Sequence, residues 1–182
     1  MKELSLNILD IAENSVKAGA TLTEITLDES EEILTVTIND DGCGMSPEIL
    51  ESVTNPFYTT RTTRSVGLGI PLFKLAAEQT GGKIEISSKV KSDEWDLHGT
   101  TVSALFYKNH IDFTPLGDVI STVTTLIFGH PDTDFLYIHK KGKNEIRLDT
   151  RELRSVLVDV PLNNYEVIEW IRGFLSEQYE SF

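Results

Sequence analysis

The sequence predicts an α+β fold, because helical and strand-like patterns of apolar residues both occur along the chain. Residues 2–17 carry apolar side chains at the three- and four-residue spacing of an amphipathic helix. Residues 33–38 (ILTVTI) are aliphatic and β-branched, as in a strand, and residues 72–79 again favour a helix. A polar or glycine-rich motif accompanies each of these elements.

The first predicted helix has a polar face beside its apolar one. Its apolar residues are Leu4, Ile8, Ile11, Ala12 and Val16. Asn7, Asp10 and Asn14 share another face, because side chains three or four residues apart lie above one another. Mg²⁺ takes oxygen ligands and keeps water and substrate phosphates, so Asn14 is a candidate ligand, with Asp10 near enough to orient a water. The alternative is a solvated face that carries these residues by chance.

An acidic, glycine-rich turn follows the predicted strand. Asp40 stands at the strand's end, and Gly42 and Gly44 allow positive φ or a close backbone approach. A carboxylate there can accept a hydrogen bond from an exocyclic amine such as that of adenine. The alternatives are a plain tight turn or a calcium-loop fragment, and a calcium loop needs oxygen ligands that Cys43 and Met45 do not supply.

The third motif has the features of a phosphate-binding loop. Gly67-Leu68-Gly69 precedes the helix at residues 72–79, with Pro71 expected at the first helical position. Backbone N–H groups at a glycine-rich helix start bind anions. Thr60 and Arg61 lie upstream and add a hydroxyl donor and a positive charge. The alternative is a flexible surface loop.

Taken together and in this order, the motifs resemble those of the GHKL ATPases, which include DNA gyrase B, Hsp-type chaperones, sensor histidine kinases and MutL proteins. Residues 9–21 resemble the N box in its mismatch-repair form, and residues 38–45 match the D-x-G-x-G box. Residues 55–61 and 65–88 resemble the F box and second glycine box of histidine kinases. Residues 98–106 are similar to the GT box, so the resemblance spans about residues 1–107.

The resemblance implies a two-layer α/β sandwich, a mixed sheet covered by helices, that binds ATP and Mg²⁺. It implies that Asn14 ligates Mg²⁺ and that Asp40 accepts from the adenine amine. Further implied roles are space for the base at Gly44, a water shared by Thr100 with Asp40 and adenine, and phosphate binding at Gly67 and Gly69. Asp10 occupies the place of a general-base Glu, although it is one methylene shorter.

Two functional classes fit this resemblance. In the first, the chain is an ATP-dependent kinase that phosphorylates a separate protein, like anti-sigma regulators or detached histidine-kinase catalytic domains. In the second, it is a nucleotide-responsive binding module with little catalysis. None of the four histidines has the setting of a kinase phosphoacceptor, so we expect structural or surface roles for them: His98, His110, His130 and His139.

Composition narrows the partners. The formal net charge of −13 over 182 residues opposes sequence-independent DNA binding, which depends on Lys and Arg. We expect a cytoplasmic protein without a leader, because no charged-then-apolar segment opens the chain and no apolar run approaches about 18 residues. Cys43 is the one cysteine, and we expect it to be a small packing residue.

We divide the chain into an ATP-binding domain, residues 1–108, and an α-β-β-α-α extension, residues 109–182. The extension is expected to contain a helix at 116–128, a hairpin at 135–149, and two helices capped by Thr150 and Asn164. Compared with the family, no strand precedes the first helix, which leaves a sheet edge to be covered. We expect the hairpin to cover it in cis or across a homodimer, and the alternative is a small independent α/β appendage.

Overall fold

A computed structural model describes residues 3–53, 68–92 and 97–182. The strands are β1 (Leu22–Glu29), β2 (Ile33–Asp40), β3 (Lys83–Lys89), β4 (Gly99–Tyr107), β5 (Asp134–Lys141) and β6 (Asn144–Asp149). The helices are α1 (Leu4–Lys17), α2 (Pro47–Val53), α3 (Gly69–Gln79), α4 (Val119–Gly129), α5 (Thr150–Leu157) and α6 (Tyr165–Glu180). None of these helices is long and apolar enough to cross a lipid bilayer.

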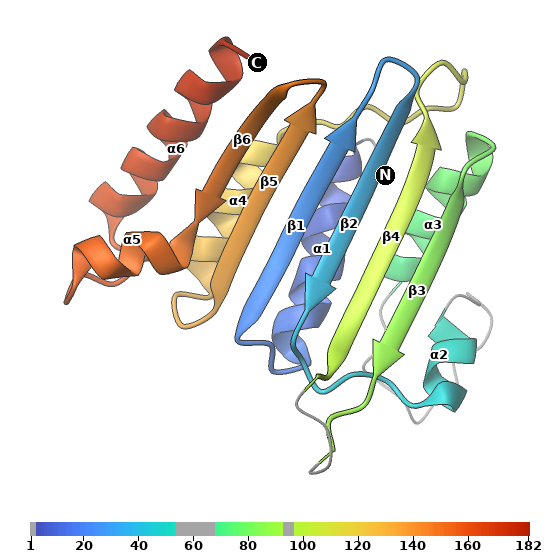
Figure 1. The fold of residues 1–182 in the computed structure, drawn as a ribbon, viewed down its shortest axis with the longest axis horizontal. Coiled ribbons are helices and arrows are strands. Elements are labelled where there is room, and N and C mark those ends of the chain that lie inside the picture. Colours follow the sequence, from blue (N-terminus) through green and yellow to red (C-terminus); the bar gives the residue numbers. More distant parts are fainter. Residues whose placement is uncertain (1–2, 54–67, 93–96) are drawn as a thin grey trace.

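The six strands form one mixed sheet in the order β3-β4-β2-β1-β5-β6 (Figure 1). Helices α1, α3 and α4 lie against one face, and α6 packs on α4 beside the β6 edge. Strand residues alternate, so that one set is buried under the helices, as Val36 and Ile38 are, and the other lines the open face. On that open face Thr37 and Ser103 share a hydrogen bond of 3.0 Å. The predicted two-layer α/β fold is therefore confirmed.

The C-terminal hairpin extends the sheet in cis, as one of the two predicted arrangements required. β5 runs parallel to β1, with Leu22–Glu29 in register with Asp134–Lys141, and β6 pairs antiparallel with β5. The alternative of an independent appendage is wrong, because one hydrogen-bonded sheet crosses from residues 1–108 into residues 109–182. The division into two domains at Lys108 stays a prediction.

The segment before α4 also completes the start of α1. The cap residue Glu3 accepts no hydrogen bond from a backbone N–H group of the helix, although its Oε2 accepts one from the Ser5 hydroxyl at 3.2 Å. Instead, the Leu4 and Ser5 backbone N–H groups donate to the carbonyls of Pro115 and Leu116, at 2.9 and 2.8 Å. The first N–H groups of a helix have no partner inside it, so this connector replaces the missing side-chain cap.

Three predicted helix starts need correction. α4 begins at Val119, not at residue 116, because Asp118 is its cap and accepts from the Ser121 N–H at 2.8 Å. α3 begins at Gly69, which makes Pro71 its third residue; Pro is tolerated there because that N–H also lacks an intrahelical partner. Asp149, not Thr150, caps α5, because it has the extended conformation of a cap and accepts from the Arg151 N–H at 3.0 Å. The predicted cap of α6 is confirmed, since Asn164 accepts from Glu166 N–H at 2.8 Å.

A buried polar chain connects the last helix to the sheet. His139 is 2% exposed, with Nδ1 at 2.7 Å from the Tyr179 hydroxyl and Nε2 at 3.1 Å from Glu29 Oε2. Tyr137 and Tyr179 hydroxyls are 2.5 Å apart, and Lys108 Nζ donates to Glu29 Oε1 at 2.6 Å. One donor order satisfies all groups if the imidazole is neutral: Tyr137 donates to Tyr179, Tyr179 to Nδ1, and Nε2–H to Glu29.

This arrangement predicts a loss of stability in mild acid. Burial, together with the nearby charges of Lys141 and Lys108, lowers the pKa of His139 below its usual 6.5, although the neighbouring Glu29 acts in the opposite direction. The unfolded chain therefore binds the proton more readily, so the stabilisation is complete above about pH 6.5 and is lost as the pH falls below it. We expect His139→Gln to flatten the fall in unfolding free energy between pH 7.5 and 5, measured by urea denaturation; one proton limits the slope to about 1.4 kcal/mol per pH unit. His110→Gln is the exposed control, and an unchanged slope in His139→Gln would contradict the prediction.

Candidate nucleotide site

A cavity of 270 Å³ lies where the C-terminal half of α1 meets the ends of β2 and β4. Its volume is close to the lower end of the range for ligand pockets, roughly 300–1,000 Å³. Its walls are largely apolar and come from four separate parts of the chain. Ile11 belongs to α1, Met45 and Ile49 to the segment after β2, Ile70 to α3 and Val102 to β4. Its polar lining includes Asn14, Ser15, Asp40 and Thr100. An apolar slot with a few fixed polar groups suits a flat heterocycle.

Asp40 is the most firmly held polar group of this cavity. It is the last residue of β2 and is 8% exposed. Ser15 Oγ donates to its Oδ2 at 2.8 Å, while Gly42 N and Thr100 N donate to Oδ1 at 2.9 and 3.2 Å. Three donors from α1, the following turn and β4 therefore fix the orientation of one carboxylate.

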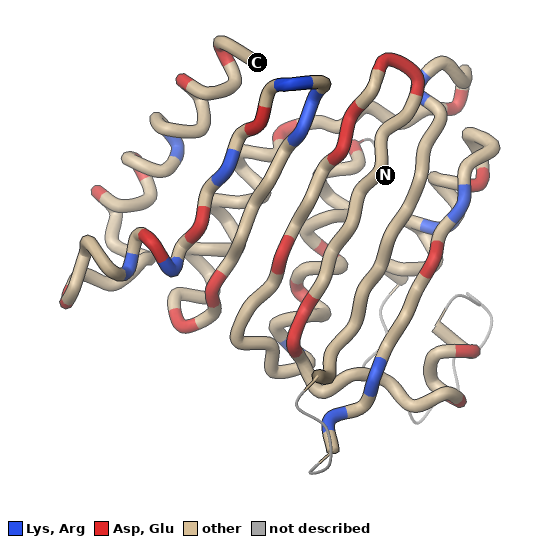
Figure 2. The backbone as a smooth tube through the Cα atoms, in the orientation of Figure 1, with Lys and Arg blue, Asp and Glu red and all other residues tan. Residues whose placement is uncertain are grey.

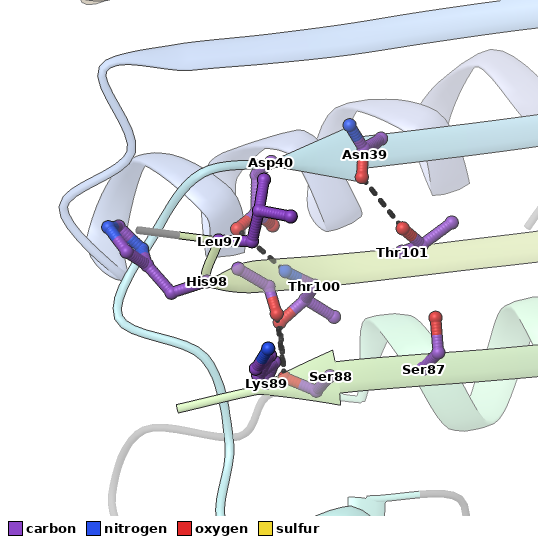
Figure 3. Close-up of a pocket in the computed structure, with 10 residues that line it drawn as sticks. Asn39, Asp40, Ser87, Ser88, Lys89, Leu97, His98, Thr100 and Thr101 are labelled. Carbon is purple, nitrogen blue, oxygen red and sulfur yellow. Dashed lines mark hydrogen bonds between the residues drawn. The ribbon is translucent and has the colours of Figure 1, made fainter. Parts of the chain in front are cut away.

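Neighbouring strands support this carboxylate in turn. Figure 3 shows hydrogen bonds that join Asp40 to Thr100 and Thr100 to Ser88, across β2, β4 and β3. The Ser88 and Thr100 hydroxyls are 2.8 Å apart, and Ser88 Oγ also accepts from Met45 N at 2.8 Å. The loop that forms one wall of the cavity is thus tied to the far strand of the sheet.

The glycines after β2 are required by close packing. A Cβ on Gly42 would lie 2.9 Å from both Ala18 Cβ and Asp40 Oδ1. Gly44 has the predicted positive φ, +70°, but its close neighbour is the Lys89 backbone, whose carbonyl oxygen would lie 2.0 Å from a Cβ. Space for a base at Gly44 therefore stays a prediction, although Gly44 does line the cavity.

The predicted metal ligand and base lie where α1 meets the start of α3. A Cβ on Gly69 would lie 3.1 Å from Asp10 Cβ and 3.8 Å from Asn14 Nδ2. Leu68 precedes α3, and its apolar side chain accepts no hydrogen bond from the first backbone N–H groups of that helix. Asn14 is partly buried in the cavity wall, whereas Asp10 is exposed outside it. Thr60, Arg61 and Gly67 lie outside the described residues.

Besides the apolar walls, sequence reasoning missed two polar side chains of the cavity, Ser15 and Lys17. Ser15 follows Ile8, Ile11 and Ala12 on the apolar face of α1, and a hydroxyl in an apolar stripe needs a buried partner, which is Asp40. The need for a buried partner was the signal in the sequence that could have identified Ser15. Lys17 also lines the cavity and is the one basic residue in the last turn of α1.

Cys43 is exposed, which corrects its expected packing role. The turn around it is held by backbone atoms and by neighbouring side chains. Cys43 N donates to Ala18 O at 2.9 Å, Lys91 N donates to Cys43 O at 2.9 Å, and His98 Nδ1 lies 2.7 Å from Gly42 O. Cys43 lines the cavity, and its Sγ lies 3.5 Å from the Gly44 carbonyl oxygen.

Comparison with known proteins agrees with the fold and the motifs. Residues 2–110 match the family described as histidine kinase-, DNA gyrase B-, and HSP90-like ATPases. That match covers more than half of the chain, so the chain belongs to this family. Membership implies ATP binding.

Three individual proteins show the range of similarity. Sensor protein SrrB of Staphylococcus aureus is 34% identical over 95 residues, a match covering 50% of this chain and 16% of SrrB. The crystal structure of the N-terminal domain of a DNA repair protein has a TM-score of 0.61 at 14% identity, covering 82% of this chain and 53% of that one, and supports the fold alone. The Aquifex aeolicus MutL ATPase domain complexed with ADP has a TM-score of 0.49 at 12% identity, covering 95% of this chain and 88% of that one. This is a distant structural similarity.

Proposed function

We propose that this chain binds Mg·ATP in the 270 Å³ cavity and transfers the γ-phosphoryl group to a separate protein. The observation that carries the first half is Asp40, whose carboxylate is held by three donors in the wall of an otherwise apolar slot. A fixed acceptor beside apolar walls recognises a flat base that carries an amine. The family supports ATP as the source of that base.

The proposed roles follow the positions of the side chains. Asp40 accepts from the adenine amine, Thr100 shares a water with it, and the apolar walls and Gly42–Gly44 turn hold the ring. The groups proposed to contact phosphates are Thr60, Arg61, Gly67, Leu68 and Gly69. Asn14 would hold Mg²⁺, which neutralises phosphate charge when bound.

Asp10 is the proposed general base. It lies one turn before Asn14 and packs against Gly69, so it is beside the N-terminus of α3, where the phosphate groups of ATP are proposed to bind. In the transfer the bond between the γ-phosphorus and its bridging oxygen breaks, the acceptor atom bonds to phosphorus, and the acceptor's proton moves to Asp10. ADP leaves with the bridging oxygen.

One observation favours the second candidate, a nucleotide-responsive binding module. Within residues 3–53, 68–92 and 97–182, no hydrogen bond or ion pair holds the Asp10 carboxylate. General bases are usually oriented by a further group. In this candidate, ATP binding alone changes how the chain contacts its partner.

The Asp40 assignment predicts a large loss of adenine affinity. We expect Asp40→Asn to weaken Mg·ATP binding roughly ten- to a hundredfold by calorimetry, because a hydrogen bond to a charged group is worth roughly 1.5–3 kcal/mol. The exposed Asp28→Asn is the matched control, and unfolding midpoints show whether Asp40→Asn keeps the fold. Equal binding of ATP and GTP by the parent protein would reject the assignment.

A further inference from the structure

Asn7 is an amide in a place that suits an apolar side chain. It lies on α1 between the buried residues Leu4, Ile8 and Ile11, and it is only 1% exposed. Its Nδ2 has no hydrogen-bond partner in the part of the chain that the structure describes. Such a group costs stability unless it finds an acceptor, and residues 3–53, 68–92 and 97–182 supply none.

Beside Asn7 there is a cavity separate from the nucleotide site. It has a volume of 70 Å³ and is lined by Asn7, Leu72, Leu75, Ala76, Gln79 and Thr114. These residues come from α1, α3 and the connector before α4, and none of them lines the 270 Å³ cavity. Of these lining residues, Leu75 is 50% exposed, whereas Asn7 is buried.

The lining determines what kind of molecule fits. Its three polar side chains, Asn7, Gln79 and Thr114, are uncharged, so an ion would lose its water without a counter-charge. Asn7 Nδ2 requires an acceptor, while Gln79 and Thr114 can donate or accept. The leucines offer contact to a short apolar body. We propose that this cavity is a binding site for an uncharged amide on a short aliphatic group, either a free small amide or a carboxamide side chain of a protein.

The site lies on the two helices that also form the nucleotide site. Asn7 is one turn before Asp10, and Leu72 is one turn after Gly69, the residue that packs on Asp10. A bound amide would contact α1, α3 and the connector at once. The proposal does not depend on ATP binding or on phosphoryl transfer.

The test uses propionamide as the probe and the ¹⁵N-labelled full chain as the protein. We expect saturable shifts of the Asn7 side-chain NH₂ resonances in the millimolar range, and no such shifts with propionate at equal concentration. A second arm compares the peptides acetyl-Ala-Gln-Ala-amide and acetyl-Ala-Ala-Ala-amide. Tighter binding of propionamide identifies a free amide, and tighter binding of the glutamine peptide alone identifies a protein side chain.

Two variants test the position of the site. Asn7→Leu removes the unpaired donor, so we expect an equal or higher unfolding midpoint, unchanged ATP binding and no propionamide site. Ala76→Leu fills the cavity from α3 and should abolish the Asn7 shifts, whereas Asn109→Leu, at an exposed position, should not. Equal shifts with propionate would overturn the proposal. It would also be overturned if neither propionamide nor the glutamine peptide perturbed the Asn7 amide because ordered water fills the cavity.

Discussion

Truncation after Lys108 is expected to abolish soluble, ATP-binding protein, although it leaves the family-matched residues 2–110 almost intact. β1 would lose its parallel neighbour β5 along its whole length and become an open sheet edge. α1 would lose the Pro115 and Leu116 carbonyls that accept from its first N–H groups. Soluble yield, circular dichroism and calorimetry with ATP measure the result.

The size of this effect follows from the core. α4 and β5 contribute six core side chains, each at most 6% exposed: Val119, Val123, Leu126, Ile127, Phe135 and Tyr137. Burying one such side chain stabilises a fold by roughly 1.5–3 kcal/mol. Losing all six approaches the entire stability of a typical domain, roughly 5–15 kcal/mol.

A nicked chain provides the control for truncation. Ile111 is 95% exposed in the connector, so a protease site inserted there should be cut without disturbing the fold. We expect both pieces to elute together after cleavage and to keep binding ATP, because sheet pairing holds them. A truncated chain that folds and binds ATP alone would instead show that residues 1–108 do not need the added strands and helices for either property.

Local patterns in the sequence predicted the elements that depend on local chemistry. The apolar periodicity of α1, the position of Asp40 at the end of β2 and the Asn164 cap all depend on residues a few positions apart. The error at α5 is also local, because Asp149 and Thr150 are both good cap residues. Thr150 does not cap the helix because its Oγ1 donates to Asp134 at 2.8 Å instead.

Contacts between distant residues were harder to predict. The pairing of β1 with β5 joins segments more than a hundred residues apart, and turn signals do not specify it. The bond from Ser15 to Asp40 depends on how α1 lies across β2. The sequence motifs named both the helix and the carboxylate, but only the packed structure shows that one holds the other. The proximity of two turns also depends on this long-range pairing. Figure 2 shows the acidic β1–β2 turn near the lysines of the β5–β6 turn.

Replacement of Asp10 by Asn is expected to lower phosphoryl transfer or ATP hydrolysis by roughly a hundredfold or more while leaving ATP affinity nearly unchanged. Asn keeps the size of the side chain but cannot take up a proton at neutral pH. Asp10 does not line the 270 Å³ cavity, so its loss should not affect the adenine contacts. Single-turnover rates with labelled Mg·ATP, together with calorimetry, separate the two effects.

Two further variants make this result specific to the base. Asp10→Glu adds the methylene that hydrolysing relatives are expected to have, so it should keep or raise the rate, because the carboxylate reaches further toward the phosphate. Asp28→Asn changes the charge equally at an exposed site on β1 and should leave the rate unchanged. If Asp10→Asn binds ATP and turns it over at the parent rate, Asp10 is not part of the mechanism. The nucleotide-responsive binding module would then be the better account, because the exposed Asp10 carboxylate would have no chemical task at the start of α3.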